Sequence, residues 1–195
     1  MCCLFGMIDY GRYFTGRQRS QILSVLATEC EARGTDATGL AYSSRSELHV
    51  YKRPLPAHKL HIRLLNDARV IMGHTRMMTQ GSAKKNYNNH TFRGSAGGFP
   101  FALAHNGVLH NDLLLRKEQK LPKTKIETDS FVAVQLLEQQ KALDFDSLKR
   151  LSHKLCKPQK ECRIESLVWR FDKWEEEIAV QKKRPVEQRY GSCWS

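Results

Sequence analysis

Short apolar segments, each bounded by turn residues, constrain the fold of this chain most strongly. They have the length and composition of β-strands. They cover residues 2–8, 39–43, 48–52, 69–74 and 101–105. The polar residues 44–47 separate the second and third segments, which predicts a hairpin.

Helical periodicity appears between these segments. Thr15 and Gln18 have the spacing of a capping box, and apolar residues follow at helical intervals up to Cys30, before Gly34 ends the run. Thr128 is expected to cap a helix that continues to about residue 143, and residues 146–155 predict another. Strands and helices together indicate an α+β fold, and 195 residues favour one main domain. Residues 81–100, rich in Gly, Asn, Ser and Lys, predict a mobile loop over a site.

Composition narrows the class of protein. A chain with 41% hydrophobic and 27% charged residues is typical of soluble globular proteins, and no apolar run reaches the roughly 20 residues of a membrane helix. We therefore expect a cytoplasmic protein with no membrane association. The net charge of +12 raises the question of a nucleic-acid partner, but the basic residues form several short groups, which favours a solvated surface. The six cysteines have no regular disulfide or zinc spacing, so we expect them to be reduced and expect no metal.

The second residue of the chain is a candidate nucleophile. If Met1 is removed, Cys2 carries both a thiol and a free α-amine, with reference pKa values of about 8.5 and about 7.7–8.0 that allow proton exchange near neutrality. Such a residue supplies its own base for attack on an amide and needs no cofactor. Position alone favours the opposite interpretation, since a cysteine beside the initiator methionine is usually incidental.

Asn106 and Gly107 follow a predicted strand. A side-chain amide and a backbone N–H at such a place could both donate to the oxyanion that forms when an amide is attacked. Taken alone, however, an Asn-Gly pair is more typical of a hairpin turn.

Five short motifs occur in the order and spacing of one enzyme family. They are Met1-Cys2-Cys3-Leu4-Phe5-Gly6 and residues 33–39, 74–81, 105–107 and 127–130. Together they resemble the glutaminase domain of class II glutamine amidotransferases, such as glucosamine 6-phosphate synthase, over about residues 1–148. The resemblance implies an αββα sandwich of the N-terminal-nucleophile (Ntn) hydrolase type. It also implies that Cys2 is the nucleophile and that Asn106 and Gly107 form the oxyanion hole.

The resemblance also implies a glutamine pocket. Glutamine presents a carboxylate and an ammonium, which Arg76 and Asp129 could bind through a planar fork of N–H donors and an ionised carboxylate. Without the motifs, a surface charge and a helix cap would be the simpler interpretations of these two residues. Thr79 and His90 are further candidate contacts.

Arg33, Gly34 and Asp36 belong to the second motif and are expected to organise the pocket rather than to react. Gly34 is expected to adopt a backbone conformation closed to other residues.

The chain departs from the family pattern in two places. Met77 and Gln80 replace a tryptophan and a histidine of the loop after the motif arginine. Beyond residue 148 there are few candidates for the strands that complete the sandwich, apart from residues 165–171, while tryptophan and basic residues become frequent. We therefore divide the chain into a glutaminase domain, 1–148, and a divergent basic tail, 149–195, and hypothesise that a truncation or frame shift leaves the sandwich incomplete.

Three functions follow from these motifs. The first is a glutaminase that passes ammonia to a separate synthase or acceptor protein. The second is an inactive remnant or a non-enzymatic basic module. The third is an Ntn amidase for another amide, which the pairing of Arg76 with Asp129 argues against because it implies an amino-acid substrate.

Overall fold

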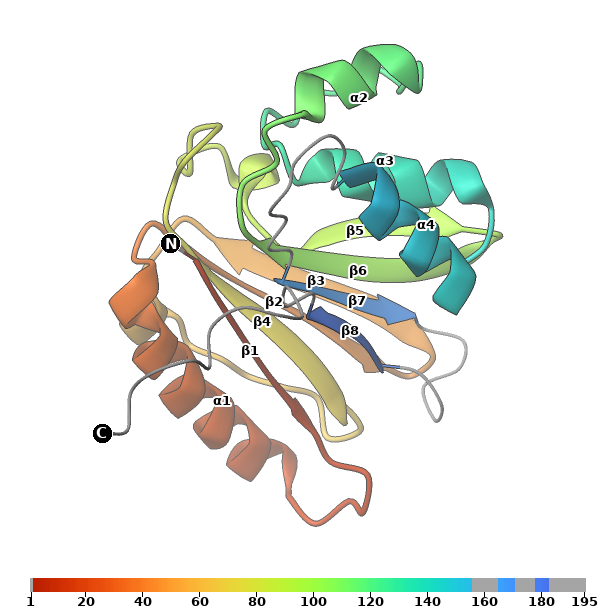
Figure 1. Ribbon diagram of the computed structural model, residues 1–195. Coiled ribbons are helices and arrows are strands. Elements are labelled where there is room, and N and C mark those ends of the chain that lie inside the picture. Colours follow the sequence, from red (N-terminus) through yellow and green to blue (C-terminus); the bar gives the residue numbers. More distant parts are fainter. Residues whose placement is uncertain (1, 156–164, 171–177, 183–195) are drawn as a thin grey trace, which may run out of the picture.

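The computed structural model describes residues 2–155, 165–170 and 178–182. Within these residues, two antiparallel four-stranded sheets account for the strands (Figure 1). The first sheet has the order β1-β4-β2-β3 and consists of β1 (Cys3–Ile8), β2 (Ala37–Ser44), β3 (Glu47–Arg53) and β4 (Val70–Arg76). The second has the order β5-β6-β7-β8 and consists of β5 (Phe92–Ala96), β6 (Phe99–Asn106), β7 (Glu165–Arg170) and β8 (Ile178–Lys182).

Helices cover the outer faces of the two sheets. Helix α1 (Gly16–Cys30) lies against the first sheet, and α2 (Asp112–Glu118), α3 (Phe131–Gln140) and α4 (Phe145–Leu155) lie on the side of the second sheet (Figure 1). The result is the expected αββα arrangement. Each predicted strand up to residue 105 overlaps an observed one to within one residue at its start, so this part of the sequence interpretation is confirmed.

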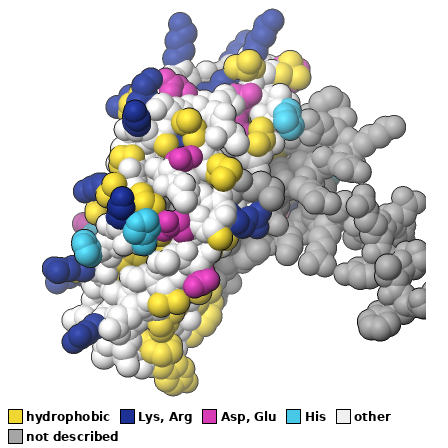
Figure 2. Space-filling view, turned by 90° about the vertical axis from the view of Figure 1, so that its left-hand side faces the viewer, with side chains coloured by type: hydrophobic (Ala, Val, Ile, Leu, Met, Phe, Trp, Pro, Cys, Tyr) yellow, Lys and Arg dark blue, Asp and Glu magenta, His cyan; other side chains and the backbone are white. Residues whose placement is uncertain are grey.

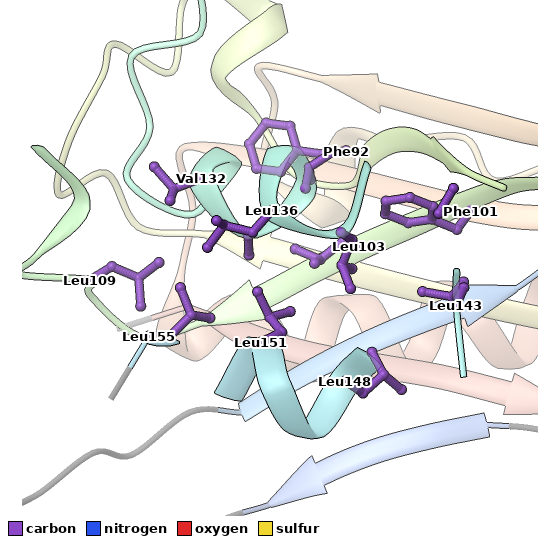
Figure 3. Packing of buried hydrophobic residues seen from close by; sticks show 14 of the residues in the cluster. Phe92, Phe101, Leu103, Leu109, Val132, Leu136, Leu143, Leu148, Leu151 and Leu155 are labelled. Atoms are coloured by element: carbon purple, nitrogen blue, oxygen red, sulfur yellow. The ribbon is translucent and has the colours of Figure 1, made fainter. Parts of the chain in front are cut away.

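Three apolar clusters fill the spaces between the four layers. One lies between α1 and the first sheet and includes Leu23, Leu40 and Ile71. Another joins the two sheets, where small residues such as Ala102 and Ala104 allow close packing. The largest lies between the second sheet and α3 and α4, where Figure 3 shows Leu136 and Leu151 pointing toward Leu103.

Helix α1 begins as the sequence predicts. The Thr15 hydroxyl accepts from the Gln18 backbone N–H at 3.2 Å, and the Gln18 side-chain oxygen accepts from the Thr15 N–H at 2.9 Å, completing a capping box. A buried ion pair fixes the approach to the helix, since Arg19 Nη1 lies 2.7 Å from the Asp9 carboxylate. Burial raises the pKa of Asp9, but the hydrogen bonds with Arg19, Tyr13 and Phe14 together lower it by more. The pKa therefore lies below its ordinary value.

The prediction of a mobile loop over residues 81–100 is wrong. Strand β5 lies in this stretch, and Asn88, Asn89 and Thr91 are fully buried. Glycine serves packing here rather than flexibility, because a Cβ on Gly94 would come within 2.4 Å of the Phe101 ring. The glycine lets the ring of a neighbouring strand lie directly over the backbone.

The expected cap of the third helix is also wrong. Helix α3 starts at Phe131, and the Thr128 hydroxyl donates to the Asn88 carbonyl at 2.8 Å instead. The helix ends at Gln140, where Lys141 adopts a left-handed conformation (φ 53°).

The C-terminal part contributes more ordered elements than the sequence suggested. Helix α4 crosses the proposed boundary between residues 148 and 149, and Leu151 and Leu155 on its far side are buried in the largest cluster. Strand β7 coincides with the predicted strand at 165–171 and pairs with β6, and β8 pairs with β7. Trp174, Trp194 and three cysteines of the proposed tail lie outside the described residues. The division into a domain and a divergent tail stays a prediction.

The surface agrees with a dispersed positive charge. On the face shown in Figure 2, Lys and Arg side chains are scattered among hydrophobic and acidic ones rather than gathered into one patch. Among the described residues, no helix combines the length and apolarity that crossing a membrane requires.

Candidate active site

Cys2 lies immediately before β1, against the end of β4. Its Sγ accepts from the Met77 backbone N–H at 3.4 Å and lies 3.5 Å from the Met77 carbonyl oxygen. The side chain is half-buried. Burial is the largest influence on the thiol and raises its pKa, while the hydrogen bond with Met77 and the positive charge of Arg76 lower it. A thiol in this setting needs a base before it can attack.

The segment of Arg33, Gly34 and Asp36 holds the end of β4 next to Cys2. Gly34 has φ −173°, an extended conformation open to any residue, so the predicted special backbone conformation is wrong. The glycine is needed for a different reason: a Cβ there would lie 2.5 Å from the Arg76 carbonyl carbon. Asp36 then accepts from the Met78 N–H at 2.6 Å. Arg33 is exposed at the end of a short 3-10 turn.

Arg76 is the last residue of β4 and is 3% exposed. Its Nη1 donates to Asn89 Oδ1 at 2.6 Å, and its Nη2 donates to the carbonyls of Gln80 and Gly81 at 2.6 and 2.8 Å. Burial lowers the pKa of the guanidinium, and the negative groups around it act in the opposite direction. Arg76 therefore also ties the loop after β4 to the end of its own strand.

Asn106 is the last residue of β6, an inner strand of the second sheet, and Gly107 follows it. Asn106 is half-buried and Gly107 is exposed, with φ 157°. Two residues later, the Leu109 N–H donates to Asp129 Oδ2 at 2.5 Å, and the other carboxylate oxygen accepts from the Ser130 hydroxyl at 3.2 Å. Asp129, which is 1% exposed, thus fixes the turn that follows the candidate oxyanion hole.

Cys2, Arg76 and Asp129 lie close enough to influence one another electrostatically. Arg76 lowers the pKa of the Cys2 thiol and Asp129 raises it, and both Cys2 and Asp129 favour the charged form of Arg76. Three residues separated by up to 127 positions in sequence therefore belong to one region of the fold. The roles of these three residues stay predictions.

The two further candidate contacts lie in different surroundings. Thr79 is exposed in the loop after β4. His90 is 4% exposed, its ring lies 4.2 Å from that of His74 and 4.5 Å from that of Phe92, and its Nδ1 accepts from the His105 N–H at 3.2 Å. The structure therefore places His90 in the interior rather than on an open pocket wall.

A buried polar network behind the site was not recognised from the sequence. His74 Nε2 donates to the His105 carbonyl at 3.2 Å, and His105 Nδ1 lies 2.8 Å from the Ser130 hydroxyl, which itself donates to Asp129. Burial lowers the pKa of His74 to about 3 and lowers those of His90 and His105 as well. The three rings are therefore neutral at physiological pH.

Two more polar residues support the loop that Arg76 contacts. Asn89 receives the Arg76 bond and donates to the Ala83 carbonyl at 2.8 Å. Lys52 Nζ donates to the carbonyls of Asn89 and Thr91 at 2.6 and 3.1 Å, and burial lowers its pKa to about 8. The sequence of residues 81–100 is polar and rich in glycine, and it did not indicate that Asn89 and Thr91 would be buried.

The fold is that of known amidotransferases. It resembles the solved structure of the allosteric regulatory enzyme of purine biosynthesis, with a TM-score of 0.63 and 18% identity over 87% of this chain and 35% of that one. It also resembles glutamine phosphoribosylpyrophosphate amidotransferase from B. subtilis, with a TM-score of 0.61 and 17% identity over the same shares of the two chains. At such identities the likeness concerns the fold alone, which agrees with the expected αββα sandwich.

The chain is also similar in sequence to curated enzymes. The chain is 36% identical over 132 residues to glutamine–fructose-6-phosphate aminotransferase [isomerizing] of Bacillus thuringiensis subsp. konkukian, matching 65% of this chain and 21% of the relative. It is 32% identical over 144 residues to the same enzyme of Bacillus licheniformis, matching 71% and 22%. No protein-family model matches the chain.

The resemblance inferred from the five motifs is confirmed: the chain has homologues among the glutamine–fructose-6-phosphate aminotransferases and shares its fold with a solved glutamine amidotransferase. It spans about one fifth of the length of the curated relatives that it matches.

Proposed function

We propose that this protein is a glutaminase that hydrolyses the side-chain amide of glutamine to glutamate and ammonia through a thioester on Cys2. The observation that carries the proposal is the common location of Cys2, Arg76 and Asp129, which interact electrostatically although they are far apart in sequence. One nucleophile, one cation and one anion are the groups that an α-amino acid amide requires. The named activity of the relatives, which use glutamine as amino donor, supports the same substrate.

The reaction begins with removal of Met1, which frees the α-amine of Cys2. Because burial raises the pKa of the thiol, the proton must be taken by a base, and we assign this role to the α-amine of the same residue, with a reference pKa of about 7.7–8.0. The thiolate then attacks the amide carbon and forms a tetrahedral oxyanion. We assign its stabilisation to the side-chain amide of Asn106 and the backbone N–H of Gly107.

Collapse of the oxyanion completes the first half of the reaction. The C–N bond breaks, the leaving nitrogen takes the proton held by the α-amine, and ammonia departs from the thioester. Water then attacks the thioester carbon with the same amine as base, which releases glutamate and restores the thiol. The same residue thus accepts and returns the proton in both halves.

The amino-acid end of glutamine is assigned to the charged pair. Arg76 attracts the α-carboxylate, and the Asp129 carboxylate, which has about four acceptor positions of which two are used by Leu109 and Ser130, attracts the α-ammonium. Thr79, exposed in the adjacent loop, is a further candidate contact. Arg33, Gly34 and Asp36 keep the end of β4 in register with Cys2 rather than touching the substrate.

The ammonia acceptor is assigned to a separate synthase or acceptor protein in the cytoplasm. The matched relatives are several times longer than the matched segment, and their name specifies fructose 6-phosphate as the second substrate. A sugar phosphate is therefore the first acceptor class to test with candidate partner proteins.

One experiment tests the function directly. The full chain is incubated with glutamine, glutamate release is measured, and a second sample is treated with the glutamine analogue diazo-oxo-norleucine before intact-mass analysis. The proposal expects loss of Met1, one covalent adduct on Cys2, and competition between the analogue and glutamine. The matched control is Cys2→Ser, which should release no measurable glutamate and take up no analogue.

Two outcomes would contradict the proposal. A processed, folded protein that releases no glutamate would favour an inactive remnant. Turnover of penicillin- or bile-salt-type amides without turnover of glutamine would favour an Ntn amidase of other specificity.

A further inference from the structure

Cys3 and Cys30 form a close pair of thiols beside the candidate site. Their Sγ atoms lie 3.0 Å apart, and both side chains are half-buried. Cys3 is the first residue of β1 and Cys30 is the last residue of α1. The pair therefore joins the first strand of the sheet to the helix that covers it.

The backbone around the pair holds the two thiols together. Cys3 pairs with Thr75 in the antiparallel register of β1 and β4, and the Thr75 hydroxyl donates to the Cys30 carbonyl at 2.9 Å. Thr75 thus contacts both ends of the pair and is itself fully buried. Because strand pairing and a buried hydrogen bond fix the two backbones, the proximity does not depend on the side chains alone.

We propose that Cys3 and Cys30 are a redox-active pair that closes into a reversible disulfide when it meets a small-molecule disulfide such as oxidised glutathione. Nothing in the glutaminase reaction uses either thiol. The inference does not rest on the proposed function, because it concerns two residues outside the candidate catalytic groups.

The exchange proceeds in two balanced steps. The Cys3 thiolate attacks one sulfur of the small disulfide, which breaks the S–S bond, forms a mixed disulfide on Cys3 and releases one thiolate. Cys30 then loses its proton and attacks the Cys3 sulfur, which releases the second thiolate. Two protein thiols are oxidised, and the small disulfide is reduced to two thiols.

The order of the steps follows from the surroundings of Cys30. Burial, reinforced by the neighbouring Cys3 thiol, raises the pKa of Cys30 to about 12, so Cys30 keeps its proton until the mixed disulfide is in place. Once Cys3 carries the mixed disulfide, the short separation makes the second attack intramolecular. Closure then outcompetes attack by another external thiol.

The disulfide would link β1, the strand that begins beside Cys2, covalently to α1. It joins residues 27 positions apart and closes a chain segment that includes the whole of α1. A disulfide of this span restricts the unfolded chain, so the oxidised protein should melt roughly 5–10 °C above the reduced one.

Peptide mapping tests the proposal in the full-length protein. The reduced protein is incubated with oxidised glutathione, free thiols are blocked with iodoacetamide, and the protein is digested with trypsin. The expected product is a crosslink between the peptide that ends at Arg12 and the peptide of residues 20–33, absent after reduction with dithiothreitol.

Variants separate Cys3 from its neighbour Cys2, which lies in the same peptide. The crosslink should persist in Cys2→Ser and disappear in Cys3→Ser and in Cys30→Ser, and the rise in melting temperature should disappear with it. Full alkylation of both cysteines after incubation, or a crosslink lost in Cys2→Ser and kept in Cys3→Ser, would overturn the assignment. A crosslink at the expected residues without a rise in melting temperature would show that the disulfide does not stabilise the fold.

Discussion

The nucleophile side and the oxyanion side of the candidate site are held by different kinds of contact. On the nucleophile side, Cys2 rests on the backbone of Met77, and Gly34 lets another piece of backbone approach Arg76 closely. On the oxyanion side, the turn after Asn106 depends on the buried Asp129 side chain. The nucleophile side therefore depends on the space between main chains. The oxyanion side depends on buried polar groups, and leaving one without a hydrogen-bond partner costs free energy of folding.

This difference predicts which substitutions should damage each side of the site. Backbone contacts tolerate changes of charge but not added volume, whereas a buried polar network tolerates small changes of volume but not loss of a partner. Substitutions can therefore damage one side at a time, and the two kinds of damage should have different kinetic and thermodynamic signatures.

The largest expected effect is that of Asn106→Ala. Removal of one oxyanion donor typically lowers kcat by about 100- to 1000-fold, while glutamine binding through its amino-acid end is retained. Steady-state kinetics of glutamate release should show the loss in kcat with KM nearly unchanged. A variant with kcat within a factor of about three of the parent would remove Asn106 from the mechanism.

Asp129 should show two separable effects. In Asp129→Asn an amide oxygen can still accept from the Leu109 N–H, so the turn is kept and only the charge for the substrate ammonium is lost. We expect KM to rise by roughly 10-fold with a smaller change in kcat. Asp129→Ala also leaves the Leu109 N–H without its acceptor, and kcat/KM should fall by about 100-fold. Equal kinetics for the two variants would show that the turn does not depend on this carboxylate.

On the nucleophile side, Gly34→Ala tests the demand for space. The added Cβ would lie 2.5 Å from the Arg76 carbonyl carbon and 2.8 Å from the Met77 nitrogen, so β4 must shift away. Overpacking of this kind lowers the free energy of unfolding by about 2–3 kcal/mol, which urea denaturation would measure. Thr35→Ala is the matched control, since Thr35 is the exposed neighbour of Gly34. A Gly34→Ala variant as stable as this control would show that the approach of the backbones is not tight.

The sequence pointed to the candidate nucleophile and the candidate charges, but not to the buried residues that support them. Cys2, Arg76 and Asp129 stand out because the motif order selects them, and the structure gathers them. The importance of Gly34 was predicted for the wrong reason, because a sequence pattern cannot distinguish a special φ from a close approach of distant backbone. The conformation of a single residue is local, whereas an approach of two main chains depends on the whole fold.

The buried polar support was missed for a related reason. All seven residues of β4 are buried, because α1 covers one face of its sheet and the second sheet covers the other. His74 and Thr75 therefore lie in the interior although their residue types are usually found nearer the surface. The same holds for Asn88, which contacts Glu127 and Thr128, and for Asn89, which contacts Arg76 and Lys52. Local composition could not predict which polar residues would be buried when the second sheet packs on the first.

The smallest effect expected of a single residue is the pH dependence of stability that His74 contributes, and it distinguishes the two sides by their chemistry. His74 is neutral in the folded protein because burial lowers its pKa to about 3, whereas in the unfolded chain its pKa is about 6.5. Between these values the unfolded state binds the extra proton. The stability contributed by the neutral ring is therefore complete above pH 6.5 and is lost progressively as the pH falls toward 3.

For His74 alone the loss between pH 7 and pH 5 should be about 2 kcal/mol, and His90 and His105, whose pKa values are also lowered, should add losses in the same direction. Urea denaturation at several pH values measures the slope. His74→Gln should flatten it, because glutamine can still donate to the His105 carbonyl but does not titrate, while replacement of the exposed His110 serves as the matched control. His105 directly precedes Asn106 and contacts Ser130, the neighbour of Asp129. Acid should therefore destabilise the oxyanion side before it affects the backbone contacts around Cys2. Equal pH slopes for the parent and His74→Gln would show that these histidines do not set this difference between the two sides.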